Sequence, residues 1–164
     1  MPSRTPAAVE LVAGILEDYA QRGTFKGFAR GTVRAGTARF RMLWHRDQFF
    51  DLILDTRRKT LRFPVVLPQV PARSEMYGEL QGFVRARQSG ELPKHRTIDP
   101  KKAVVRTSNR AGNVALTVSV RGTDYEYATR KLIHLVHEIY LGFLYDGAYY
   151  DYMVETFGLD PDHM

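Results

Sequence analysis

The chain of 164 residues contains no cysteine, which excludes a disulfide framework, a thiolate nucleophile and a zinc site built on cysteine. It also lacks a long apolar run, because the densest apolar stretch, residues 132–145, contains two histidines and one glutamate. A membrane-spanning helix needs about 20 mostly apolar residues. Near the N-terminus, Glu10, Glu17 and Asp18 interrupt the apolar residues, unlike a secretory signal peptide. We therefore expect a cytoplasmic protein with no membrane partner.

Motifs for catalysis and cofactor binding are missing as well. None of the five serines lies in Gly-x-Ser-x-Gly, and no glycine-rich turn is followed by Lys-Ser or Lys-Thr. The stretch from His134 to Glu138 matches neither His-Glu-x-x-His nor His-x-x-Glu-His, so we expect a solvated His–Glu pair on a polar helix face. The sequence therefore predicts no enzyme, no catalytic residue, no cofactor and no metal.

Basic groups are scarce in the last part of the chain. Residues 1–121 carry 22 Lys and Arg against 10 Asp and Glu, a balance of +12, whereas residues 122–164 carry 2 against 8, a balance of −6. Seven of the nine tyrosines also lie in residues 122–164. One part of the chain can therefore attract what the other repels, which indicates binding or assembly and names no reaction.

The spacing of apolar residues predicts an α+β protein with an antiparallel sheet. The predicted order is helix, three or four strands, helix, two strands, long helix and short C-terminal helix. Helices are expected at residues 6–21, 72–88, 123–145 and 148–157, and strands at residues 25–33, 37–45, 49–55, 60–67, 103–108 and 113–121. We see no domain boundary, so residues 1–164 form one domain in which residues 146–164 are an aromatic and acidic extension.

Two local signals refine these elements. Pro64 cannot donate a hydrogen bond to a neighbouring strand, so the strand at residues 60–67 should lie at an edge or end early. The stretch from Thr123 to Glu126 has the pattern of a capping box, in which Thr123 caps the long helix.

The apolar arc of the long helix is wider than one packing face requires. Ile133, Tyr140 and Leu144 widen its stripe to roughly half of the circumference. The helix is therefore either deeply buried or shared between the sheet and a second subunit. We take these three residues as candidates for a protein interface in a homodimer or with a client.

The tyrosines of the C-terminal extension are further interface candidates. Tyrosine supplies amphipathic contact area and is enriched in protein interfaces. Docking of the extension onto its own chain explains the pattern equally well. The residues concerned are Tyr149, Tyr150 and Tyr152.

Arginine-bearing strands form a candidate surface for polyanions. A sheet that presents basic and aromatic groups can bind single-stranded nucleic acid through phosphate contacts and base stacking. However, Phe40 and Trp44 alternate with the arginines of their strand, so we expect these aromatic rings to face the core, without a stacking platform. The candidate residues are Arg39, Arg41, Arg57, Arg58 and Arg62.

The predicted order of elements is similar to the type III secretion chaperone fold and to the bacterial YbjN-like proteins that share it. The resemblance extends from residue 6 to about residue 145 and includes the strand at residues 113–120 and the long helix opened by Thr123. It implies a dimer that binds protein segments and performs no chemistry. Secretion chaperones tend to be acidic, whereas this chain is basic and has an additional aromatic tail. We expect a non-enzymatic, chaperone-like binding module with an unidentified client; the alternative is a single-stranded nucleic-acid-binding protein.

Overall fold

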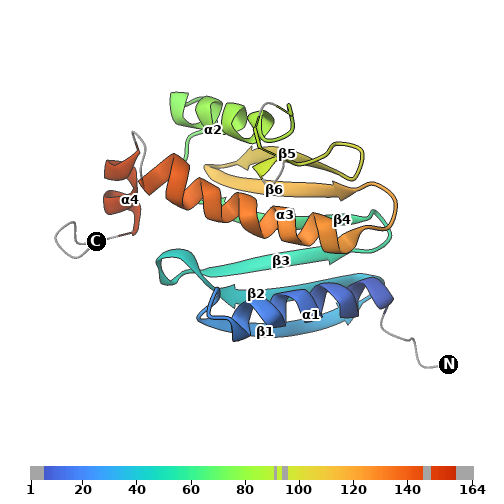
Figure 1. The fold of residues 1–164 in the computed structure, drawn as a ribbon. Coiled ribbons are helices and arrows are strands. Elements are labelled where there is room, and N and C mark those ends of the chain that lie inside the picture. Colours follow the sequence, from blue (N-terminus) through green and yellow to red (C-terminus); the bar gives the residue numbers. More distant parts are fainter. Residues whose placement is uncertain (1–5, 91, 94–95, 146–148, 158–164) are drawn as a thin grey trace.

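The computed structural model describes residues 6–90, 92–93, 96–145 and 149–157 (Figure 1). Its six strands form one sheet in the order β1-β2-β3-β4-β6-β5, and every neighbouring pair is antiparallel. The strands are β1 (Gly27–Arg34), β2 (Thr37–Leu43), β3 (Phe49–Asp55), β4 (Thr60–Leu67), β5 (Ala103–Arg110) and β6 (Asn113–Val120). The helices are α1 (Ala7–Gln21), α2 (Glu75–Ala86), α3 (Tyr125–Glu138) and α4 (Tyr150–Phe157), with a 3-10 turn η1 (His45–Asp47) and a π-helical segment η3 (Ile139–Tyr145). The predicted α+β class with an antiparallel sheet is confirmed.

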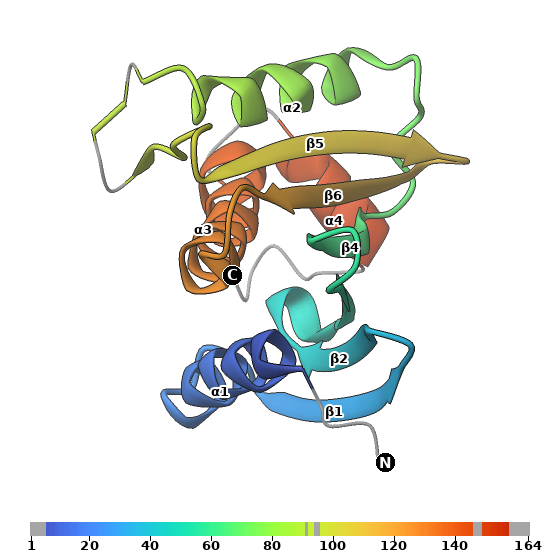
Figure 2. The ribbon, with the colours of Figure 1, turned by 90° about the vertical axis from the view of Figure 1, so that its right-hand side faces the viewer.

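Helices α1 and α3 contact each other and lie on one face of the sheet, whereas no described helix covers the opposite face (Figures 1 and 2). Most of the core lies between the sheet and these two helices, and buried residues of α2 and α4 extend it. Strand β2 shows the division most clearly, because Phe40 and Met42 are buried against the helices while Arg39 and Arg41 are exposed on the other side. This alternation is the one that the sequence predicts. Full burial of one large apolar side chain stabilises the fold by roughly 1.5–3 kcal/mol.

The two edges of the sheet differ. Helix α2 lies along β5 (Figure 2), and the Gln88 side chain bonds the Val105 backbone twice, donating to its carbonyl over 3.1 Å and accepting from its N–H over 3.0 Å. At Val105 the Gln88 amide thereby makes the two hydrogen bonds that a neighbouring strand would make. Strand β1 pairs only with β2 among the described elements, and its register shifts between Arg30 and Val33. One edge is therefore capped and the other is uncapped.

Pro64 does not place β4 at an edge, because the strand lies between β3 and β6. Its pairing with β3 ends at Arg62, and its register with β6 shifts between Phe63 and Leu67. Pro64 therefore lies where the regular ladder is interrupted and its missing N–H is tolerated. The prediction of an edge was wrong, whereas early termination holds for the pairing with β3.

The predicted cap of the long helix was wrong by one residue. Asp124 is the N-cap of α3, and its carboxylate accepts a hydrogen bond from the Tyr127 N–H over 3.0 Å. A carboxylate at this position also interacts favourably with the helix dipole. Glu126 therefore does not reach back to a Thr123 cap but pairs with Arg130 along the helix surface.

Candidate functional site

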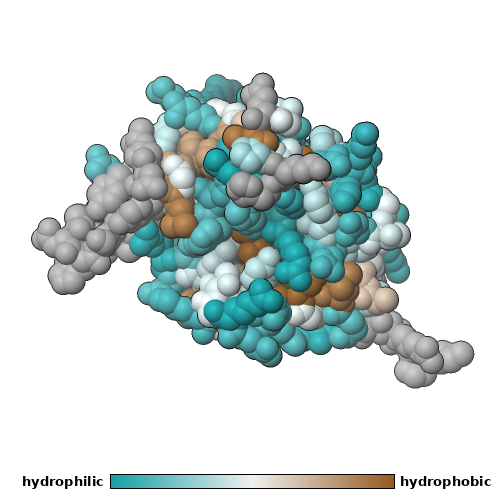
Figure 3. Space-filling model, viewed as in Figure 1, coloured by the Kyte–Doolittle hydropathy of each residue, from teal (hydrophilic) through white to brown (hydrophobic). Residues whose placement is uncertain are grey.

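The three helix residues proposed for a subunit interface are buried inside the chain. The exposed fractions are 2% for Ile133, 1% for Tyr140 and 0% for Leu144. The Tyr140 hydroxyl donates to the Val66 carbonyl over 2.7 Å, and burial raises the pKa of that hydroxyl. The wide apolar arc is therefore filled by the chain's own core and no longer argues for a second subunit. The helix-side surface shows separate hydrophobic patches among hydrophilic residues (Figure 3).

The described part of the aromatic tail docks within the chain. The Tyr149 ring stacks on Phe143 with 5.1 Å between centroids, and its hydroxyl donates to the Glu79 carboxylate. That hydrogen bond, with burial, raises the pKa of Tyr149 to about 12. The Tyr152 hydroxyl donates to the Pro68 carbonyl. The side chain of Tyr150, the third tyrosine proposed for an interface, lies outside the described residues.

The uncovered face of the sheet, which we call the open face, brings together arginines from three strands. Register places Arg39 opposite Ile53, Ile53 opposite Arg62, and Arg62 opposite Thr117, which pairs in turn with Arg106. Directly paired residues share one face of an antiparallel sheet, so these five residues form a continuous line, the arginine row. With about 4.8 Å between strands, the arginines repeat every ~10 Å over a length of ~19 Å.

Within the described part of the chain, the arginines of this row have no carboxylate partner. Arg39, Arg62 and Arg106 are exposed, and none forms an ion pair with a described residue. The row therefore presents three positive charges on one uncovered surface. A solvated guanidinium offers five N–H donors in a planar fork that suits phosphate or carboxylate oxygens.

The other predicted polyanion-binding arginines are placed differently. Arg41 lies on the open face but is paired with Asp51. Arg57 and Arg58 lie in the turn between β3 and β4, where their backbone N–H groups donate to the Asp55 carboxylate over 3.0 and 3.1 Å. The sequence analysis missed Arg106, because its alignment with Arg62 depends on the strand order, which apolar spacing does not reveal.

An exposed aromatic ring lies on the open face beside the arginines. The Phe49 side chain is 65% exposed, and the Arg41 guanidinium lies 5.3 Å from the centroid of its ring. Two hydrogen bonds to Asp51, of 2.8 and 3.3 Å, orient that guanidinium. Phe40 and Trp44 face the core as predicted, and Phe49 adds an exposed ring to the open face that the sequence analysis did not name. The Phe49-Phe50 pair was the available signal, since adjacent residues of a strand point to opposite faces.

The predicted solvated His–Glu pair is instead part of a half-buried charge cluster, in which His134 stays 45% exposed. The Glu138 side chain, 12% exposed, accepts from Arg87 over 2.8 Å, Arg96 over 3.2 Å and His134 over 2.9 Å. Burial raises the pKa of Glu138, but its hydrogen bond and attraction to Arg87, followed by Arg96 and His134, lower it overall. The cluster ties α2 to α3. In the described ranges, no group of three His, Cys, Asp or Glu residues could hold a metal ion.

A strained turn holds a half-buried histidine. The η1 residues Arg46 and Asp47 both have left-handed φ angles, 57° and 55°. The ring of His45 stacks parallel to Tyr140 at 4.6 Å and lies 5.3 Å from His137, and its Nε2 has no described hydrogen-bond partner. Burial, then repulsion by His137 and Arg46, lowers the pKa of His45 to about 3.

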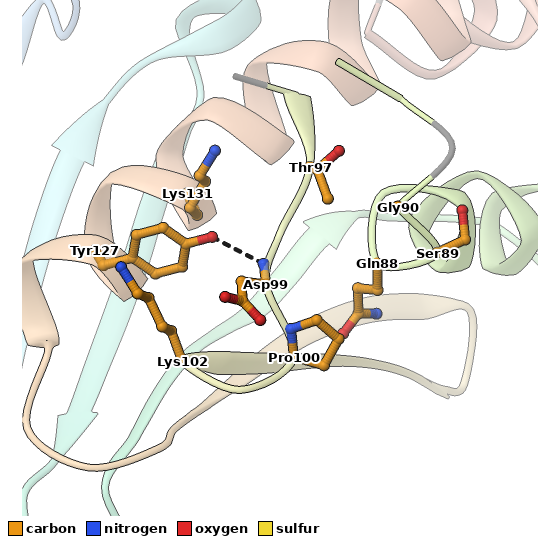
Figure 4. A pocket seen from close by; sticks show the side chains of 9 residues that line it. All are labelled: Gln88, Ser89, Gly90, Thr97, Asp99, Pro100, Lys102, Tyr127 and Lys131. Atoms are coloured by element: carbon orange, nitrogen blue, oxygen red, sulfur yellow. Dashed lines mark hydrogen bonds between the residues drawn. The ribbon is translucent and has the colours of Figure 1, made fainter. Parts of the chain in front are cut away.

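A cavity of about 690 Å³ lies between the loop after α2 and the start of α3 (Figure 4). The Lys102 and Lys131 ammonium groups lie 4.8 and 5.5 Å from the centroid of the Tyr127 ring. The Tyr127 hydroxyl accepts from the Asp99 N–H over 2.8 Å, and the Asp99 carboxylate accepts from the Lys101 N–H. These contacts link residues 99–102 to the start of α3.

Two further findings concern membrane-spanning helices and similarity to known proteins. Among the described residues, no helix has the length and apolar character needed to cross a membrane. Comparisons with protein-family models, curated proteins and solved structures found no match for this chain.

Proposed function

We propose that this chain is a non-enzymatic binding module that binds a polyanionic chain on the open face of its sheet. The observation that carries this proposal is the arginine row, in which three exposed arginines on an uncovered surface have no described carboxylate partner. The net charge of +6 at pH 7 supports the same class of partner.

Counterion release supplies the physical reason for this binding. A polyanion surrounds itself with condensed cations, and each arginine that neutralises one of its charges releases such an ion to the solvent. A flat row ~19 Å long fits an extended chain, which can meet the three arginines in sequence. The Arg41–Asp51 pair contributes less attraction, because its charges already compensate each other.

Heparin affinity chromatography tests the proposal. Arg39→Gln combined with Arg62→Gln should elute at clearly lower salt than the wild type, because two of the three row charges are removed. The matched control is Arg73→Gln combined with Arg85→Gln, which removes two exposed charges near and on α2. It loses the same net charge but keeps the arginine row, so it should elute at higher salt than the row variant. Equal elution of both double variants contradicts the open face as the binding surface.

A second candidate is the chaperone-like homodimer implied by the resemblance to YbjN-like and type III secretion chaperones, acting in the cytoplasm. It is favoured by the uncapped edge of β1, where Val33 is 40% exposed. Such an edge can accept a strand from a second copy or from a client. Light scattering at micromolar concentration should then give a dimer that Val33→Lys dissociates, and a monomeric wild type contradicts this candidate.

A further inference from the structure

We infer that the polyanion is a single-stranded nucleic acid and that one of its bases stacks on Phe49. This inference rests on the proposed function and specifies its ligand. It is carried by an observation separate from the arginine row, namely an exposed phenyl ring on the same face, held next to an oriented guanidinium.

Phe49 has the features of a preformed stacking platform. Its side chain is the most exposed of the large hydrophobic side chains in the described part of the chain, at 65%. Arg41 lies 5.3 Å from the ring centroid, and the two hydrogen bonds that its guanidinium donates to the Asp51 carboxylate fix it there. A base that adds to the ring therefore meets a surface whose orientation is already set, and stacking of bases on aromatic rings is tolerant of sequence.

Phe49 and the arginine row contact different parts of the ligand, the ring a base and the row the phosphates. Arg41 is paired with Asp51 and supports the ring, whereas Arg39 and Arg62 have no described carboxylate partner and remain available to phosphates. Phe49 and Ile53 lie on the same face of β3, four residues or ~13 Å apart along the strand. One extended ligand can thus reach both features without leaving the open face.

The aromatic ring distinguishes a single strand from other polyanions. The bases of a duplex are stacked on each other and are not free to cover a protein ring, and heparin and polyglutamate have no bases. The arginine row alone attracts all of these ligands through their charge. Only a single-stranded nucleic acid uses both the row and Phe49.

Fluorescence anisotropy with four probes tests the inference: a labelled single-stranded oligodeoxynucleotide, its duplex, heparin and polyglutamate. Phe49→Ala should weaken binding of the single strand roughly 5- to 150-fold, the range expected for one stacked base, and leave the other three nearly unchanged. Leu11→Ala, which truncates an exposed leucine (42%) on α1, is the matched control and should alter no affinity. Phe49→Trp should retain the affinity, and the single strand should quench the fluorescence of the new indole.

The outcomes separate this inference from the proposed function. Salt-sensitive binding of all four probes, with Phe49→Ala changing none of them selectively, overturns the base-stacking inference and leaves the polyanion-binding surface in place. Tighter binding of polyglutamate than of the single strand overturns the choice of nucleic acid. Failure of every probe to bind at low salt overturns both.

Discussion

At the scale of single residues, the arginines of this chain differ by what their guanidinium groups meet. Arg87 is buried against Glu138, Arg41 is paired with Asp51 on the surface, and Arg39 has no described carboxylate partner. The sequence predicts which side of β2 Arg39 and Arg41 occupy, because strand alternation is local. It does not predict which acidic residue each arginine meets. Arg87, for example, pairs with Glu138, which lies 51 positions away along the chain.

His45 makes a residue-scale prediction about pH. Its pKa, about 3 in the fold against 6.5 for an ordinary histidine, means that the unfolded chain binds this proton more tightly. The stability that neutral His45 provides is therefore complete above about pH 6.5 and is lost progressively as the pH falls toward 3, by up to ~1.4 kcal/mol per pH unit. His137, whose pKa is also lowered by burial, adds to the loss.

His45→Phe tests this account, because phenylalanine keeps the stack on Tyr140 and cannot be protonated. Urea unfolding between pH 7 and pH 5 should show a shallower loss of stability for the variant than for the wild type. Parallel pH profiles of the two proteins contradict the assignment of the effect to His45.

At the scale of elements, periodicity predicts the positions of strands and helices well, and tertiary contacts decide the rest. Strands β3 and β4 have the predicted bounds, because their limits are set by nearby turn residues. For Pro64 the sequence left two alternatives open, an edge strand or early termination, because it does not reveal where a ladder is interrupted. The pairing of β4 with β6, which completes the arginine row, joins distant segments and had no local signal.

The contact between α2 and α3 gives an element-scale prediction. Glu138→Gln leaves the buried Arg87 guanidinium without its carboxylate, so the free energy of unfolding should fall by about 3 kcal/mol. Glu126→Gln, which breaks an exposed pair with Arg130 on the same helix, should cost at most about 0.5 kcal/mol. Chemical denaturation measures both, and equal losses contradict a structural role for the half-buried cluster.

At the scale of the whole molecule, two sequence patterns led to different results: the wide apolar arc of the long helix, and the contrast in charge between residues 1–121 and 122–164. The arc belongs to the core, where Tyr140 and Leu144 are buried within their own chain. The arc is therefore as wide as the sequence indicates, but it does not support an interface with a second subunit. The excess of positive charge in residues 1–121 includes the arginine row on the open face. The sequence thus predicted part of the candidate site through Arg39 and Arg62, and the fold adds Arg106 and Phe49.

The measurement that tests the central claim most directly is the salt dependence of single-strand binding by the wild type and by the triple variant Arg39→Gln, Arg62→Gln, Arg106→Gln. Three phosphate contacts predict a slope of about −2 in a plot of log K against log salt concentration, since each contributes about −0.7. The account predicts that the triple variant, folded as judged by its unfolding curve, loses nearly all of this slope. An unchanged slope in the triple variant would contradict binding of a polyanion by the open face.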